Sequence, residues 1–267
     1  MPANSAQLRA AVELALAGRV SAPFALPERR VEFVSTGISE VDALAGGLPR
    51  GALTEIFGPT CSGRTSLLFS ALEARTSHAE ACALVDGSDA FDPQSAEAAG
   101  IDLKRLLWVR CRTLEQSFRA TDFLLAAGGF GFIALDLGDT PGELVHRVPL
   151  ETWFRFRRAV EGTPTILFVL EEEPHAKTCA SLVLQVEAAR SRWNLTAQDE
   201  SAAGLHRYPF SRLFDGSDVR AELVRSRTQQ GVKTDFRDGR DPLVAGGDKS
   251  IVFETREISG LPRSRPT

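Results

Sequence analysis

The sequence predicts an α/β fold in which a mostly parallel sheet is flanked by helices. Short apolar runs alternate with helical segments from about residue 53 to residue 190. Such alternation is typical of parallel strands, because each crossover must return the chain to the same end of the sheet. The chain has 267 residues, of which 43% are hydrophobic and 25% charged. This composition excludes a mostly disordered chain and is sufficient for a full core.

The chain before the sheet is expected to be a helix followed by a linker. Residues 5–19 are rich in Ala and Leu, with Ser5 placed to cap the helix and Gly18 placed to end it. The following residues contain prolines and one strand-like run, VEFV. We therefore separate residues 1–34, a helix and linker, from the main body.

The core elements follow from apolar periodicity and from Gly and Pro breaks. We expect helices over residues 37–46, 65–75, 93–99, 114–128 and 150–162. We expect strands over residues 53–57, 81–86, 106–111, 130–136, 165–170 and 179–190. These elements define a core of residues 35–190.

After residue 190 the composition changes. Residues 196–217 are rich in Ala, Ser, Asp and Gly and are expected to form a loop. Residues 218–227 and 249–257 are expected to pair as a late antiparallel hairpin, within an extension over 191–257, and residues 258–267 to be a disordered tail. The window 218–240 has a small excess of basic residues, which fits either a solvated hairpin or a weak DNA or partner contact.

Charge and cysteine content limit the classes of function. The net charge of −4 disfavours a strongly basic nucleic-acid binder, although 27 of the 31 basic residues are arginine. The four cysteines have no zinc-site spacing, and we expect them to be reduced and, apart from Cys61, buried. No signal peptide and no long apolar run is evident, so we expect a cytoplasmic protein without a membrane span.

The most informative motif is a phosphate loop of the form GxxxxG[K/R][S/T]. It lies directly between a predicted strand and a predicted helix, the context in which this motif binds phosphate. Its glycines allow backbone N–H groups to converge on an anion, and the following helix adds its positive N-terminal end. The predicted nucleotide-binding residues are Gly58, Pro59, Thr60, Cys61, Ser62, Gly63, Arg64, Thr65 and Ser66.

Position 64 departs from the motif, which has Lys there. The planar guanidinium of Arg64 can neutralise phosphate, but from a different place than the compact Lys ammonium. The loop is therefore either a weak site for ATP and Mg²⁺ or a scaffold that holds no nucleotide. Asp136 ends a buried strand and is the expected metal partner of Thr65, with loop capping as the alternative.

These residues resemble RecA. STGISEVDALAGGLPRGALTEIFGPTCSGRTSL is similar to the segment that leads into and through the RecA phosphate loop, and VDGSDAFDPQSAEAAGIDLKRLLWV is similar to the stretch after it. The matching positions of that second stretch are Asp86, Ala90, Asp92, Pro93, Gly100 and Asp102. The resemblance covers about residues 35–190 and implies a RecA-like phosphate-loop core.

Departures from RecA bear on activity. The catalytic glutamate of RecA falls on Ser88, which cannot act as a general base, and Asp89 is expected to point elsewhere. The strand-ending glutamine of RecA falls near Glu171, followed by Glu172 and Glu173, three acids that would either repel phosphates or form a solvated turn. The connections after Asp136 and after Glu173 are shorter than DNA-binding loops. We therefore expect no catalytic residue and little or no ATPase activity.

A second resemblance fits these losses better. The segments LLWVR, GGFGFIALDLG, VPLETWFRFRRAVEGTPTILFVL and RAELVRSR are similar to ImuA, a family of RecA-like accessory proteins of SOS-linked mutagenic translesion synthesis. This resemblance implies RecA or translesion polymerase subunits (an ImuB-like protein or an error-prone polymerase) as partners, with only weak or indirect DNA contact. Residues 5–35 resemble the RecA segment that packs on a neighbouring subunit, which implies docking on RecA or self-association; the alternative is a helix that folds back on its own domain. The alternative is an ATP-dependent, single-stranded-DNA-binding ATPase of the recombinase type.

Overall fold

The computed structural model describes residues 31–195, 212–227 and 250–256. The described residues from Glu32 onward belong to one compact unit. The predicted helix at 5–19, most of the linker and the predicted tail at 258–267 lie outside the described residues. No helix of the described part combines the length and the apolar character that a membrane span requires.

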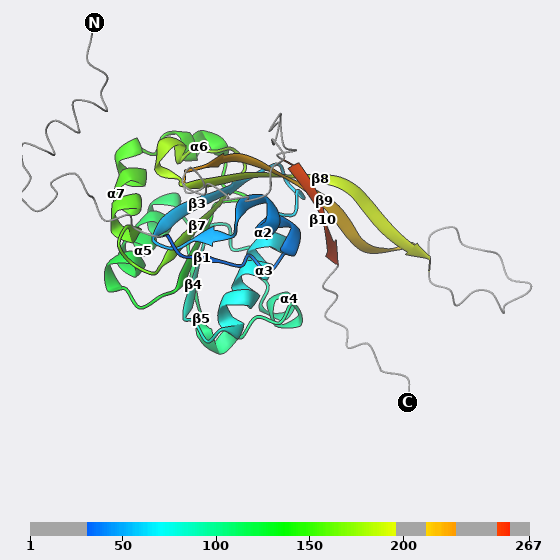
Figure 1. The fold of residues 1–267 in the computed structure, drawn as a ribbon. Coiled ribbons are helices and arrows are strands. Elements are labelled where there is room, and N and C mark those ends of the chain that lie inside the picture. The colour runs from blue at the N-terminus through cyan, green and yellow to red at the C-terminus, as the bar shows by residue number, and fades with distance from the viewer. Residues whose placement is uncertain (1–30, 196–211, 228–249, 257–267) are drawn as a thin grey trace, which may run out of the picture. The chain divides into compact units, whose positions relative to one another are not determined.

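An eight-stranded sheet forms the centre of this unit, in the order β10-β9-β8-β3-β7-β6-β4-β5 (Figure 1). Neighbouring strands from β8 to β5 are parallel, and β9 and β10 add two antiparallel pairs at the other edge. The strands are β3 Ala52–Phe57, β4 Cys82–Asp86, β5 Leu106–Arg110, β6 Phe132–Asp136, β7 Ile166–Glu171, β8 Leu182–Leu195, β9 Arg212–Ser226 and β10 Ser250–Arg256. A separate antiparallel pair joins β1 Phe33–Val34 to β2 Leu48–Pro49. The α/β architecture, with its late antiparallel hairpin, is confirmed.

Six α-helices and two short 3₁₀ helices connect the described strands. They are α2 Ser39–Ala45, α3 Arg64–Ser77, α4 Pro93–Ala98, η1 Leu103–Arg105, α5 Leu114–Ala127, α6 Gly142–His146, α7 Leu150–Val160 and η2 Lys177–Cys179. Side-chain caps fix several starts: Asp92 accepts the N–H groups of Gln94 and Ser95 at α4, and Thr113 accepts that of Gln116 at α5.

The core has two layers, one on each face of the sheet. Strand β6 shows the alternation: Phe132 and Ala134 face one layer, while Ile133 and Leu135 face the other. Helices α2, α3 and α4 bury their apolar residues in the first layer, and α5, α6 and α7 bury theirs in the second. Both faces of the central strands are therefore covered, which explains their continuous apolar runs.

Strands β8 and β9 are longer than predicted. The predicted loop over 196–217 is wrong in its last part, because β9 begins at Arg212, which pairs with Leu195 of β8. Beyond Gln185, β8 is paired with β9 but no longer with β3, so the two strands continue as a ribbon (Figure 1). The predicted core boundary at residue 190 falls inside β8.

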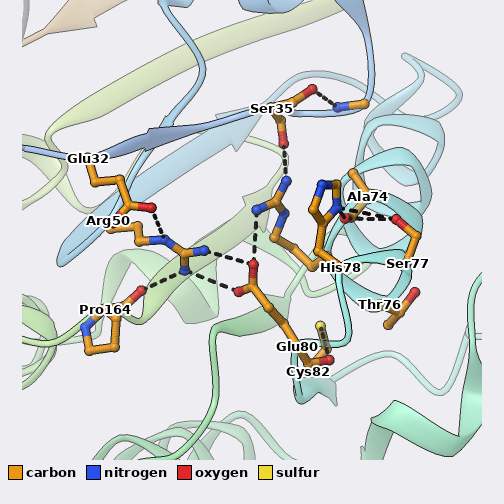
Figure 2. A network of polar contacts seen from close by, with 12 residues as sticks. Glu32, Ser35, Arg50, Ala74, Thr76, Ser77, His78, Glu80, Cys82 and Pro164 are labelled. Atoms are coloured by element: carbon orange, nitrogen blue, oxygen red, sulfur yellow. Dashed lines mark hydrogen bonds and ion pairs between the residues drawn. The ribbon is translucent and has the colours of Figure 1, made fainter.

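An ion network joins the segments that precede the amino ends of the parallel strands (Figure 2). Arg50, just before β3, makes two hydrogen bonds to Glu80, at 2.7 and 3.1 Å, and a third to the carbonyl of Pro164 at 3.0 Å. Arg75 of α3 also donates to Glu80, at 3.1 Å, and its side chain is only 4% exposed. Although burial alone would raise the pKa of Glu80, the two arginines lower it below its ordinary value.

Candidate functional site

The phosphate loop connects β3 to α3 at the carboxyl ends of the parallel strands. Its turn uses two left-handed residues, Cys61 at φ 60° and Gly63 at φ 93°, and Gly63 caps the helix. The amide of Gly58 donates to the carbonyl of Glu171 at 3.3 Å, which ties the start of the loop to the end of β7. The first amides of α3 have no partner within the helix and are available to an anion.

The loop packs closely against the last strands of the sheet. A Cβ on Gly58 would collide with the backbone carbonyl of Val186 in β8, and one on Gly63 would lie 2.5 Å from the side chain of Val219 in β9. Both glycines therefore meet a packing requirement that is independent of phosphate binding.

Arg64, the departure from the motif, is buried. As the first residue of α3 it is 7% exposed, and its Nη1 is buried with no hydrogen-bond partner among the described residues. Arg64 lines a cavity of about 60 Å³ together with Thr65, Asp136, Gly138 and Asp139. An unpartnered buried charge is costly, so this position points to a group that the cavity is shaped to receive.

Asp136 shares this cavity at the end of β6. Its Oδ1 accepts the amide of Gly138 at 2.9 Å. Burial raises the pKa of Asp136 to about 6, while the Gly138 hydrogen bond and the charge of Arg64 act in the opposite direction. The structure thus brings Thr65 and Asp136, the predicted metal ligands, into one cavity, but with the Arg64 guanidinium beside them.

This arrangement fits phosphate better than Mg²⁺. Arg64 lines this cavity, and its Nη1, which has no hydrogen-bond partner among the described residues, is a donor that a phosphate oxygen can accept. A divalent cation between Thr65 and Asp136 would instead lie beside a buried guanidinium of the same sign. The residues present therefore do not fit a magnesium ion at this position. In the described part of the chain, no group of three or more His, Cys, Asp or Glu side chains is placed to hold a metal ion.

The loop after β4 contains Ser88, the position that the resemblance to RecA aligns with the catalytic acid. Buried Asp86 accepts the amides of Ser88, Ala90 and Phe91 and the indole N–H of Trp108, so one carboxylate organises the whole turn. The hydroxyl of Ser88 accepts the amide of Asp139 at 3.3 Å.

Asp89, the neighbouring acid, points away from the cavity. It takes a left-handed φ of 55° and pairs with exposed Arg110 at 2.6 and 2.7 Å. This geometry agrees with the expectation that Asp89 faces elsewhere.

A buried carboxylate pair lies on the other face of the sheet. Glu55 of β3 is fully buried and accepts the amides of His175 and Ala176, each at 2.7 Å. Glu171 is 1% exposed and its Oε2 lies 2.8 Å from the imidazole Nδ1 of His175. Burial raises the pKa of Glu171 to about 7. The pKa of His175 is also raised, because its imidazole is hydrogen-bonded to Glu171.

This cluster corrects the interpretation of the acidic strand end. Glu171 is neither a surface charge nor part of a solvated turn, because its carboxylate is buried against His175; Glu172 and Glu173 are exposed. Sequence reasoning missed Glu55 and His175. The available signal was a glutamate in the middle of a buried parallel strand, a position where charge is rare.

The two connections predicted to be short are also ordered. The one after β6 contains helix α6, which was not predicted. The one after β7 is held by the Glu55 bonds to His175 and Ala176. In both, polar backbone groups are engaged within the protein.

Comparison with known families agrees with this description. Residues 23–145 match the model of the RecA N-terminal domain, a range that includes the phosphate loop, the Asp86 turn and Asp136. Together with the sheet order and the loop geometry, this match supports a RecA-like fold for this part of the chain.

Proposed function

We propose that this RecA-like protein is an accessory protein of SOS-linked mutagenic translesion synthesis, as its resemblance to ImuA implies. It acts through protein partners, with RecA or translesion polymerase subunits (an ImuB-like protein or an error-prone polymerase) as the expected ones. Its nucleotide site is degenerate, and it hydrolyses ATP very slowly or not at all.

The observation that carries this proposal is the position of Ser88. Its hydroxyl is bonded to the Asp139 amide, and Asp89 is engaged by Arg110 outside the cavity. Neither group can take a proton from an attacking water, which phosphoryl transfer to water requires. The ordered connections after β6 and β7 add support, because they lack the length and basic composition of DNA-gripping loops.

Exposed apolar side chains also favour action through proteins. Phe123 of α5 is 69% exposed, and Leu144, Leu150 and Phe154 of α6 and α7 are 38–45% exposed. A groove of about 380 Å³ lies between α5 and the α6–α7 segment. Large exposed apolar side chains near a groove are typical of protein-binding surfaces.

Two assays test the proposal. ATP turnover by the full chain, with and without single-stranded DNA, should not exceed that of the Asp136→Ala variant. A pull-down with purified RecA and purified translesion polymerase subunits should recover a direct complex, which Phe123→Ser weakens and the exposed control Val224→Ser on β9 does not. Capture of none of these partners would contradict the proposal.

A recombinase-type ATPase is the alternative, and one observation favours it. Asp139 is exposed and lines the same cavity as Arg64 and Asp136. If Asp139 replaced the missing acid as the base, DNA-stimulated turnover would be robust and would be lost in Asp139→Asn. The accessory role predicts no such turnover in either protein.

A further inference from the structure

The cavity beside the phosphate loop contains a charge without a counterpart. Arg64 is more than nine-tenths buried, and its Nη1 has no hydrogen-bond partner in the part of the chain that the structure describes. Among the described residues, no carboxylate lies within ion-pair distance, 4.0 Å, of its guanidinium. The helix N-terminus and the unpartnered arginine are independent features, and both favour an anion here.

The guanidinium also lies close to the position expected for the metal. Its Cζ and Nη1 are 3.4 Å from the point where a Cβ on Gly138 would lie, and Asp136 Oδ1 is 3.0 Å from the same point. Arg64 and Asp136 are thus neighbours across the missing side chain of Gly138. Lys at position 64 would leave this space to a cation, whereas the planar guanidinium occupies it.

We infer that Arg64 takes the place of the divalent metal, so that the site binds the terminal phosphates of a nucleotide in their metal-free form. This inference deepens the degenerate nucleotide site of the proposed function and rests on it. The guanidinium donates to phosphate oxygens and supplies the positive charge that Mg²⁺ would otherwise bring. Magnesium then competes with the protein, because it binds the same phosphates and is repelled by Arg64.

The size of the cavity limits the class of ligand. A volume of about 60 Å³ accommodates a phosphate group but not a nucleoside, so any base and ribose must lie outside the cavity. The ligand chemistry is therefore a polyphosphate end, which a nucleoside triphosphate and inorganic triphosphate share.

The test is calorimetric titration of the full chain with ATP, in EDTA and in excess MgCl₂. We expect ATP to bind in EDTA, and Mg²⁺ to weaken binding by about tenfold, the loss expected for one charge-assisted contact. Arg64→Lys should reverse this order and make binding depend on Mg²⁺, and Arg64→Gln should lose binding in EDTA. Arg119→Lys, at an exposed position on α5, should behave as the wild type.

Binding of ATP that requires Mg²⁺ in the wild type, or no binding in either condition, would overturn the inference. Inorganic triphosphate titrated in EDTA shows whether the nucleoside contributes affinity. Circular dichroism and the unfolding midpoint of each variant exclude misfolding. Failure here would leave the complex with RecA or polymerase subunits untouched, because the pull-down does not depend on nucleotide.

Discussion

The amino and carboxyl ends of the parallel strands hold buried arginines in opposite circumstances. At the amino ends, Arg50 and Arg75 converge on Glu80, and each guanidinium donates hydrogen bonds to it (Figure 2). At the carboxyl ends, Arg64 is buried like Arg75, but its Nη1 has no partner among the described residues. The first arrangement stabilises the fold, and the second leaves a group prepared for a ligand. Burial of an arginine therefore does not distinguish structure from function, whereas its hydrogen-bond partners do.

Removing Glu80 gives the largest expected effect. In Glu80→Ala, buried Arg75 and partly buried Arg50 would lose their shared acid, and the free energy of unfolding should fall by about 3 kcal/mol. Glu32 is the matched control, because it pairs with the same Arg50 but is 70% exposed. Glu32→Ala should cost less than about 1 kcal/mol. Equal losses in the two variants, measured by urea unfolding, would contradict the contrast between the two ends.

The pH dependence of stability gives the next effect. The folded-state pKa of Glu171, about 7, lies above its ordinary value of 4.5, so the folded state retains a proton that the unfolded chain releases. The resulting stability is complete below about pH 4.5 and is lost as the pH rises through 7; the raised pKa of His175 acts in the same direction.

Glu171→Gln tests this directly. Between pH 5 and pH 8 the free energy of unfolding of the wild type should fall by about 2 kcal/mol more than that of this variant. Glu172→Gln changes an exposed neighbour and should retain the full wild-type slope. Urea unfolding at several pH values provides the measurement. If the unfolding free energy of Glu171→Gln fell with pH as steeply as that of the wild type, the buried cluster would not hold the proton.

Arg64 itself should contribute least to stability. Replacing it with the apolar Met removes an unpartnered buried charge, so the unfolding free energy should change by less than about 1 kcal/mol or increase. Arg75→Met, which breaks a satisfied network, should cost about 3 kcal/mol. A large loss in Arg64→Met would mean that Arg64 holds the fold together, as Arg75 does.

Much of the fold was predictable because its signals are local. The apolar runs, the glycine-rich turn and the capping residues Asp92 and Thr113 lie within a few residues of the elements that they determine. Only the first part of β9, residues 212–217, was missed, because Asp, Gly and Ser at 215–217 have low strand propensity and this part is a strand through its pairing with β8.

The parts of the site that were missed depend on distant contacts. Glu55 and His175 are 120 positions apart, and Arg50 and Glu80 are 30 apart. Chain spacing carries no information about such pairs. The loop residues and Asp136 could be proposed from motif order and from a strand end, and Ser88 from the resemblance to RecA. The burial of Arg64 depends on packing that the motif does not encode.

Because the loop glycines are needed for packing, their presence in the motif does not by itself indicate that the protein binds nucleotide. Gly58 faces the backbone of Val186, and Gly63 faces the side chain of Val219. A descendant that had ceased to bind nucleotide altogether would still be under selection to retain both glycines, since a larger residue at either position would collide with β8 or β9. The presence of both glycines therefore indicates that the fold is retained, and it does not show that nucleotide is bound. Side chains that the fold does not require, above all Arg64, are the ones that can indicate a site that still binds nucleotide.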